Sequence, residues 1–266
     1  MTLLIDADYL AYKSCAACED EADFGDDVIV VTSRFSEVLI TFKRELDNIS
    51  RWIGDSDDIT LFFSSPTNFR KTISPDYKGH RNRKKPCGYK RLLNWCGDNY
   101  VTIMIDDLEA DDALGIFATD PVEAQAGHIL CSPDKDMRQI PGLLFDLTNP
   151  VTEITKEAGD LWHFIQTMSG DQTDGYAGVP TIGIKRAAAI LETEGCNWQA
   201  VLDTFNSKGM TEDDALKNAR LAKILQFENF DHDANIPILW TPTTSHGVDS
   251  GTKLQVEASG GSPAYC

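Results

Sequence analysis

Aspartate and glutamate side chains gather directly after short apolar segments, and they are the groups in this chain best suited to do chemistry. Asp6 follows the apolar segment Leu3–Ile5, and further acids follow Val101–Ile105 and Ile129–Cys131. Carboxylates brought together at strand ends repel one another unless positive charge lies between them, and Mg²⁺ or Mn²⁺ held by carboxylate oxygens supplies that charge. The candidate metal ligands are Asp6, Glu109, Asp111, Asp112, Asp134, Asp136, Asp171 and Asp174.

A second candidate feature is a basic segment inside a strongly acidic protein. The formal net charge is -18, yet between Arg70 and Arg91 there are nine Lys or Arg residues and one acid, Asp76. Such a local excess is typical of a phosphate-binding surface, while the alternative is a solubilising loop. The candidate DNA contacts in this segment are Arg70, Lys71, Arg83, Lys84 and Lys85.

A glycine-containing turn at 178–183, followed by a helical pattern, has the form of a helix-hairpin-helix. Glycines let a backbone approach a phosphate closely, and the helix N-terminus that follows offers amide donors and a positive dipole. Contacts of this kind position a duplex without reading its bases. The candidate residues are Gly178, Val179, Gly183, Lys185 and Arg186. The alternative is an ordinary turn between two helices.

The elements that must position these groups follow a strand–helix alternation. Apolar runs at 2–5, 59–63, 101–105, 127–131 and 143–147 alternate with helical patterns, which predicts an α/β fold with a parallel sheet flanked by helices. Helices are predicted at 34–52, with Ser33 as N-cap, and at 109–118. Ligands of such sheets bind at the carboxyl ends of the strands, where the first three acidic groups are expected to meet.

The chain is predicted to have an α/β core at 1–150, with a basic, arch-like insertion at about 66–100. A helical region with the helix-hairpin-helix follows at 151–242, and a poorly ordered tail is expected at 243–266. Within the helical region we expect helices at 157–168, 183–194 and 211–230, the last opened by a capping box at Thr211 and Asp214.

Composition bounds the class of protein. A hydrophobic content of 42% and a charged content of 25% are typical of a soluble globular protein. No apolar run approaches the roughly 18 residues of a membrane span, and the N-terminus does not resemble a signal peptide. Seven cysteines without regular spacing are expected to be free thiols in a reducing compartment, so a cytoplasmic location is predicted. The same irregular spacing argues against a zinc site.

Five motifs in order carry a resemblance to a known family. They are Leu4-Ile5-Asp6-Ala7-Asp8, Tyr77-Lys78-Gly79-His80-Arg81, Glu109-Ala110-Asp111-Asp112, Ser132-Pro133-Asp134-Lys135-Asp136 and Gly170-Asp171-Gln172-Thr173-Asp174-Gly175. Over roughly residues 3–242 the chain resembles the 5′-nuclease (flap endonuclease) superfamily. Within it the chain looks most like the 5′→3′ exonucleases of short-tailed, T7-like bacteriophages, and residues 69–91 and 209–212 carry that closer likeness.

The resemblance implies a metal-dependent nuclease that acts on duplex DNA with a 5′ end or flap, and also on RNA primers or RNA–DNA hybrids, in the host cytoplasm. Asp6, Glu109, Asp111 and Asp134 would hold one Mg²⁺, with Asp112 close by, and Asp136, Asp171 and Asp174 a second, with Mn²⁺ able to substitute. Two ions about 4 Å apart can activate water and stabilise the leaving oxygen. Lys78 and Arg81 would steer the scissile phosphate, Tyr77 would stack on a terminal base, and K⁺ would bind at 178–186.

One departure from the family pattern leaves alternatives open. The family has an acid after the second strand, where this chain has Ser64-Ser65, and Ser65 is aligned with that acid. A DNA-structure-binding protein that has lost catalysis is therefore one alternative. Another is a phosphatase of the haloacid dehalogenase type, because Asp6-Ala7-Asp8 would imitate the nucleophile pair of that class. Such a phosphatase would need neither the basic segment nor the hairpin. The balance between exonuclease and flap endonuclease is also open.

Overall fold

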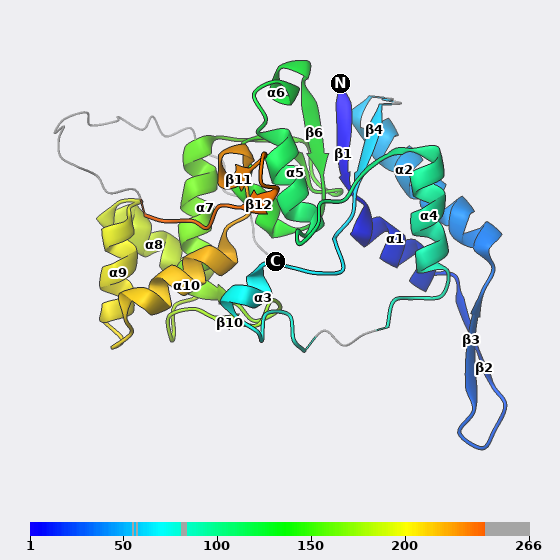
Figure 1. Ribbon diagram of the computed structural model, residues 1–266, viewed down its shortest axis with the longest axis horizontal. Helices are drawn as coiled ribbons and strands as arrows, with labels where there is room; N and C mark the ends of the chain where they lie inside the picture. Colours follow the sequence, from blue (N-terminus) through cyan, green and yellow to red (C-terminus); the bar gives the residue numbers. More distant parts are fainter. Residues whose placement is uncertain (55, 57, 81–83, 243–266) are drawn as a thin grey trace.

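The centre of the protein is a six-stranded sheet in the order β5-β4-β1-β6-β7-β8 (Figure 1). The computed structural model describes residues 1–54, 56, 58–80 and 84–242. The strands are β1 (Thr2–Asp6), β4 (Ile59–Phe62), β5 (Val101–Ile103), β6 (His128–Cys131), β7 (Gly142–Phe145) and β8 (Thr152–Ile154). Neighbouring strands from β5 to β7 pair in parallel, and β8 pairs antiparallel with β7. The predicted α/β class is confirmed, and β8 is a strand that the sequence pattern did not predict.

Both faces of the sheet are covered because successive strand residues point to opposite sides. In β1, Leu3 and Ile5 pack against α1 (Ala7–Ala16), α2 (Phe35–Ile53) and α4 (Tyr89–Asn99). Leu4 lies on the other face, in the core formed with α5 (Ala110–Ala118) and the 3₁₀ helix η1 (Lys135–Gln139). All three strand residues are fully buried, and each such side chain stabilises the fold by about 1.5–3 kcal/mol. Two short helices, α3 (Arg70–Ile73) and α6 (Glu123–Ala126), lie in the connections.

The long helix predicted at 34–52 is α2, shifted by one residue at each end. Its N-cap is Arg34 and not Ser33, and Gly54 ends it in the left-handed conformation with φ 101°. The Ser33 hydroxyl is buried without a hydrogen-bond partner in the described structure, so the predicted capping role is wrong.

The helical region contains α7 (Lys156–Ser169), α8 (Ile184–Glu194), α9 (Trp198–Asn206) and α10 (Glu212–Ala222) around their own apolar core. The predicted capping box of α10 is present. The helix predicted at 211–230 is too long, because Lys223 is extended, and α9 was not predicted. The chain after α10 instead forms η2 (Phe227–Asn229), β11 (Phe230–Asp231) and β12 (Ile236–Pro237).

The segment after α10 returns to the α/β core and packs on α5. A Cβ at Gly115 would lie 2.1 Å from the Leu225 carbonyl oxygen, so only glycine allows this approach. Leu225 is buried with Leu108, Ile116 and Phe230 in a small apolar cluster. The helical region is thereby joined to the sheet region.

A hairpin of β2 (Glu19–Asp23) and β3 (Ile29–Ser33) projects from the body beyond α1 and was not predicted (Figure 1). Its apolar side chains are largely exposed, as at Phe24 (71%) and Ile29 (61%). Among the described residues, no helix is long and apolar enough to cross a membrane. The predicted tail at 243–266 lies outside the described residues.

Candidate active site

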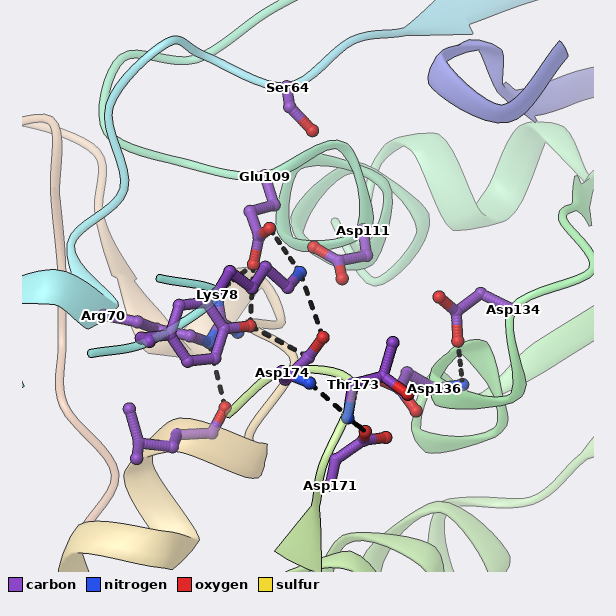
Figure 2. A network of polar contacts seen from close by, with 12 residues as sticks. Ser64, Arg70, Lys78, Glu109, Asp111, Asp134, Asp136, Asp171, Thr173 and Asp174 are labelled. Atoms are coloured by element: carbon purple, nitrogen blue, oxygen red, sulfur yellow. Dashed lines mark hydrogen bonds and ion pairs between the residues drawn. The ribbon is translucent and has the colours of Figure 1, made fainter. Parts of the chain in front are cut away.

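The predicted acids meet at the carboxyl edge of the sheet. Asp6 ends β1, and Asp134 follows the neighbouring strand β6. Along the chain, β4 and β5 are added on one side of β1, and β6 and β7 on the other. Open α/β sheets form their ligand-binding crevices at such a switch point, here between β1 and β6. A cleft of about 450 Å³ lies there, lined by Asp6, Tyr9, Pro133, Asp134, Lys135, Asp136, Asp171, Thr173 and Asp174. Glu109 and Asp111 come from the start of α5 and lie beside Lys78 and Asp174 (Figure 2).

Local hydrogen bonds fix the carboxylates of the β1–β6 side. Asp6 accepts from the Ser132 hydroxyl at 2.9 Å, and Asp134 accepts from the backbone N–H of Asp136 at 2.9 Å, which caps η1. Gln166 of α7 donates to Asp136 at 2.5 Å. Burial, together with the charges of Asp8 and Asp134, raises the pKa of Asp6 to about 6. Burial and the charge of Asp134 raise the pKa of Asp136 to about 7. The cleft therefore holds more negative charge than its own surroundings compensate.

The small hairpin of β9 (Gly170–Asp171) and β10 (Tyr176–Ala177) delivers the acids of the helical region. Asp171 accepts from the backbone N–H groups of Thr173 (2.7 Å) and Asp174 (3.3 Å), so its own turn holds it (Figure 2). The Lys135 ammonium donates to Asp171 and lies 3.9 Å from Asp136. Burial acts to raise the pKa of Asp171, but Lys135 and the two N–H groups outweigh it and lower that pKa.

Lys78 links the acid that precedes α5 to an acid of the β9–β10 hairpin. Its ammonium lies 2.5 Å from Glu109 and 3.6 Å from Asp174. Burial acts to raise the pKa of Glu109, but the charges of Lys78 and Arg70 dominate and lower it to about 2. Lys78 has a positive φ of 52°, unusual for a residue with a side chain, and its N–H donates to the Asp174 carbonyl at 2.8 Å. Backbone strain of this kind concentrates at functional sites.

Tyr77 is placed differently from its prediction. The residue is only 2% exposed, and its single hydroxyl proton is shared between Glu109 at 2.9 Å and Asp174 at 3.1 Å. A buried ring cannot stack on a nucleic-acid base, so the predicted stacking role is wrong. Tyr77 instead holds the two carboxylates that Lys78 also contacts.

Asp112 and Arg70 also leave their predicted roles, because they form a buried ion pair. Asp112 is 0% and Arg70 1% exposed, and the guanidinium binds both oxygens of Asp112, at 2.5 and 2.8 Å. The carboxylate oxygens of Glu109, Asp111 and Asp112 lie within 4.8 Å of one another, a spacing that could hold a metal ion. Since both oxygens of Asp112 are already bound to Arg70, we assign this pair to the fold. Burial, with the charges of Asp112 and Glu109, raises the pKa of Asp111 well above its ordinary value.

The serine facing the site is Ser64 and not Ser65. The Ser64 hydroxyl accepts from the Ala110 N–H at 3.0 Å, and the side chain lies near Glu109 in Figure 2. The Ser65 hydroxyl is instead 3.3 Å from that of Thr67. Asp8 accepts from the Ser64 N–H and from the Tyr89 hydroxyl, which ties it to the connection after β4 and to α4.

The basic segment is partly exposed. Lys71, Lys84 and Lys85 are exposed and could contact DNA, and Lys85 lies over the Tyr89 ring at 4.4 Å. Arg70 cannot do so, because it is buried. The predicted roles of Arg81 and Arg83 lie outside the described residues.

The glycine turn precedes α8, as predicted, and its two glycines differ. A Cβ at Gly178 would lie 2.2 Å from the Ser169 carbonyl carbon, so internal packing requires that glycine. Gly183 is the N-cap of α8, and a Cβ there would meet nothing within 4 Å. Lys185 and Arg186 are exposed beside it, whereas Val179 is buried, so that only the Val179 backbone could serve a phosphate. The open side of this turn is therefore the Gly183 end.

The family model described as the 5′-3′ exonuclease, N-terminal resolvase-like domain matches residues 1–158. The chain belongs to this family. It is 28% identical to the exodeoxyribonuclease of Enterobacteria phage T3, over 90% of this chain and 92% of the relative. It is 27% identical to the exonuclease of Escherichia phage T7, over 90% and 93%. The predicted class of enzyme, a nuclease, is confirmed at the level of the family, and the dehalogenase-type alternative is not retained.

Solved structures confirm the fold. The bacteriophage T5 flap endonuclease, in a pseudo-enzyme-product complex with DNA and metal ions, has a TM-score of 0.63 at 15% identity and covers 84% of this chain and 89% of its own. The catalytic core of Rad2 in complex with a DNA substrate has a TM-score of 0.53 at 11% identity and covers 91% and 83%.

Sequence reasoning missed the polar groups that hold the acids. Lys135 could have been found, because it lies between Asp134 and Asp136 in a motif already singled out. Ser132 opens the same motif, whereas Gln166 gave no signal, since a lone polar residue in a helix has no distinctive pattern.

Proposed function

We propose that this member of the 5′-3′ exonuclease family hydrolyses phosphodiester bonds from the 5′ end of duplex DNA and at 5′ flaps, using divalent metal ions. The observation that supports this most directly is the cleft at the β1–β6 edge, which is lined by acids from three regions of the chain and by Lys135, with Lys78 3.6 Å from Asp174 beside it. RNA primers and RNA–DNA hybrids are included among its substrates, because chemistry directed at the backbone does not exclude a 2′-hydroxyl. The host-cell cytoplasm is the proposed location.

The donor set of the cleft fits hard divalent cations. All its candidate ligands are carboxylates, the ligands that Mg²⁺ and Mn²⁺ prefer. Burial and neighbouring carboxylates raise the pKa values of Asp6, Asp111 and Asp136, so a bound cation would stabilise their ionised forms. We place one Mg²⁺ at Asp6, Glu109, Asp111 and Asp134, and a second at Asp136, Asp171 and Asp174, with Mn²⁺ able to substitute. Two such ions would activate the attacking water and stabilise the leaving oxygen.

The chain's own cations would position the substrate. Lys78, held between Glu109 and Asp174, would attract the scissile phosphate from the side of the basic insertion at 66–100. Lys71, Lys84 and Lys85, with Arg81 and Arg83, would contact the strand backbone. The open Gly183 end of the glycine turn, with Lys185 and Arg186, would grip the duplex downstream through phosphates and a K⁺ ion. In this division, 1–150 carries most of the metal ligands, and 151–242 grips the duplex and supplies Asp171 and Asp174.

The test is product analysis of 5′- and 3′-labelled blunt, recessed and 5′-flap duplexes in Mg²⁺, with Asp136→Asn as the inactive variant. Glu153→Gln, an exposed acid on the edge strand β8, is the matched control. Products released from the 5′ end by the wild type and the control, and abolished in Asp136→Asn, are expected. Their lengths separate exonuclease from flap endonuclease. Binding without cleavage in Mg²⁺ and Mn²⁺ would instead establish the non-catalytic DNA-binding protein.

A further inference from the structure

A second and larger cleft lies beyond the acidic one and shares two of its residues. It has a volume of about 840 Å³, within the range of sites that hold small organic ligands. Tyr9 and Pro133 line both clefts, so the second begins where the first ends, next to Asp6 and Asp134. None of its other lining residues has a role in the proposed chemistry.

The walls of this cleft suit a planar heterocycle. Its floor contains Leu10, Ile49 and Phe145, all buried. Two aromatic side chains remain open beside them, with Tyr9 42% and Trp52 64% exposed. The Trp52 ring lies against Phe145, with centroids 5.9 Å apart. A nucleobase stacks on such rings whatever its identity, because every base has a π-face.

The polar rim supplies groups for a base edge and a phosphate. Lys13 is paired with Glu45 at 2.8 Å, so those two charges cancel. Arg51 donates to the Asn48 side-chain oxygen at 2.8 Å and to a backbone carbonyl, and within the described residues it has no carboxylate partner. The rim therefore keeps one net positive charge and the Asn48 amide N–H groups, which can pair with base acceptors.

We propose that this second cleft binds one unpaired nucleotide of the substrate strand, adjacent to the scissile phosphate and on the side away from Lys78. The inference rests on the proposed function, because it takes the acidic cleft as the place of cleavage. Lys78 contacts Glu109 and Asp174, while the second cleft adjoins Asp6 and Asp134, so the two features lie next to different acids of the site. A strand crossing the carboxylates would then have its phosphate guided by Lys78 and its next base seated between Tyr9 and Trp52.

The experiment pairs a protein variant with base removal in the DNA. Flap substrates carry a single abasic residue at each of the three positions on either side of the cleaved bond. Affinity is measured by fluorescence anisotropy in Ca²⁺, and single-turnover cleavage in Mg²⁺. Trp52→Ala is compared with the wild type and with Ile40→Ala, which removes another exposed apolar side chain (66%) of the same helix outside the cleft. Trp52→Phe keeps an aromatic ring, and thermal unfolding shows that each variant is folded.

In the wild type, Ile40→Ala and Trp52→Phe, one abasic position should weaken binding about ten-fold, the size of a single base–aromatic stack. In Trp52→Ala the same base removal should weaken binding less, by about three-fold, because only Tyr9 is left to stack on that base. Equal losses in Trp52→Ala and the wild type at every position would overturn the inference. Competition by a free deoxynucleoside 5′-monophosphate that Trp52→Ala abolishes, without any such coupling, would mean a product site and would also overturn it. Coupling in Ca²⁺ without cleavage in Mg²⁺ would instead contradict the proposed function and leave the nucleotide site standing.

Discussion

Replacing Asp112 by asparagine should destabilise the protein severely, whereas the same change at its neighbour Asp111 should not. The two acids are adjacent in the first turn of α5, and their directions differ by about 100° because a helix has 3.6 residues per turn. Asp111 lies near Glu109 in Figure 2, and Asp112 is turned to Arg70. Asn preserves the size of either side chain and removes its charge.

The magnitude follows from what Asp112→Asn leaves behind. Asp112 accepts two hydrogen bonds from Arg70 and one from the Leu225 N–H, at 3.1 Å. Without the carboxylate, the buried guanidinium keeps the backbone carbonyls of Leu221 (3.0 Å) and Lys223 (2.6 Å) and a longer contact of 3.5 Å with Glu109. Removing one partner of a buried ion pair costs about 3–5 kcal/mol. With a urea slope of about 2 kcal/mol per M, the unfolding midpoint should fall by about 2 M.

Asp111→Asn has the opposite physical basis. The pKa of Asp111 is raised well above its usual range by burial and by the charges of Asp112 and Glu109, so its ionised form is disfavoured in the folded protein. A neutral amide removes that repulsion, and in EDTA this variant should be at least as stable as the wild type. It should, however, lose much of the stabilisation that Mg²⁺ gives to the wild type, since a ligand bound only to the native state raises stability.

The assay is urea unfolding followed by circular dichroism, in EDTA and across a Mg²⁺ titration. The double variant Arg70→Met/Asp112→Leu serves as a control, because replacing both partners of a buried pair by apolar residues costs far less than removing one. The reasoning would be refuted if Asp112→Asn unfolded at the wild-type urea concentration in EDTA while losing its response to Mg²⁺. Asp112 would then be a metal ligand, as the sequence had predicted.

Three further outcomes are expected. Burial lowers the pKa of His163 to about 3, against about 6.5 in the unfolded chain. As the pH falls through 6.5, only the unfolded state takes up the proton, so the free energy of unfolding decreases. His163→Gln should reduce this decrease between pH 7.5 and 5.5 by about 1.4 kcal/mol in urea unfolding, and parallel curves for the two proteins would argue against the reasoning. Replacing residues 20–32 by a short glycine-containing turn should leave the thermal midpoint nearly unchanged, since the hairpin adds nothing to the described apolar cores; a drop of several degrees would show a missed contact. Lys78→Met should slow single-turnover cleavage at least about ten-fold, while anisotropy shows little change in affinity; a loss confined to affinity would make Lys78 a tether.

The strand pattern predicted the sheet and the edge where the acids meet, because both depend on local sequence. A parallel strand buried on both faces is a short apolar run, and the residue after it lies at the carboxyl edge. Asp6 and Asp134 could be placed in this way. The β2–β3 hairpin was missed because the acids of β2 have low strand propensity and the hairpin packs on no core.

The roles of Asp112, Arg70 and Tyr77 could not be predicted, because they depend on chain segments far away. Arg70 donates to the carbonyl of Leu221, 151 residues later, and a list of basic residues gives no sign of that partner. Tyr77 is buried against Tyr176, Leu221 and Ala222 in the same way. A basic or aromatic residue in such a segment looks exposed in the sequence, so it is predicted to bind a ligand. Only the fold shows which element covers it.

Lys78 and Lys135 each connect two parts of the fold. Lys78 contacts Glu109 of the α/β core and Asp174 of the β9–β10 hairpin, and Lys135 of η1 contacts Asp171 of the same hairpin. The family model ends at residue 158, before Asp171 and Asp174, so the part of the chain that defines the family contains an incomplete set of acids. The site is completed only when the helical region docks on the sheet, through Leu225 on α5 and through Arg70, whose donors reach the end of α10. The buried Arg70–Asp112 pair therefore supports the site without touching the substrate, because it fixes the region that supplies the second group of carboxylates.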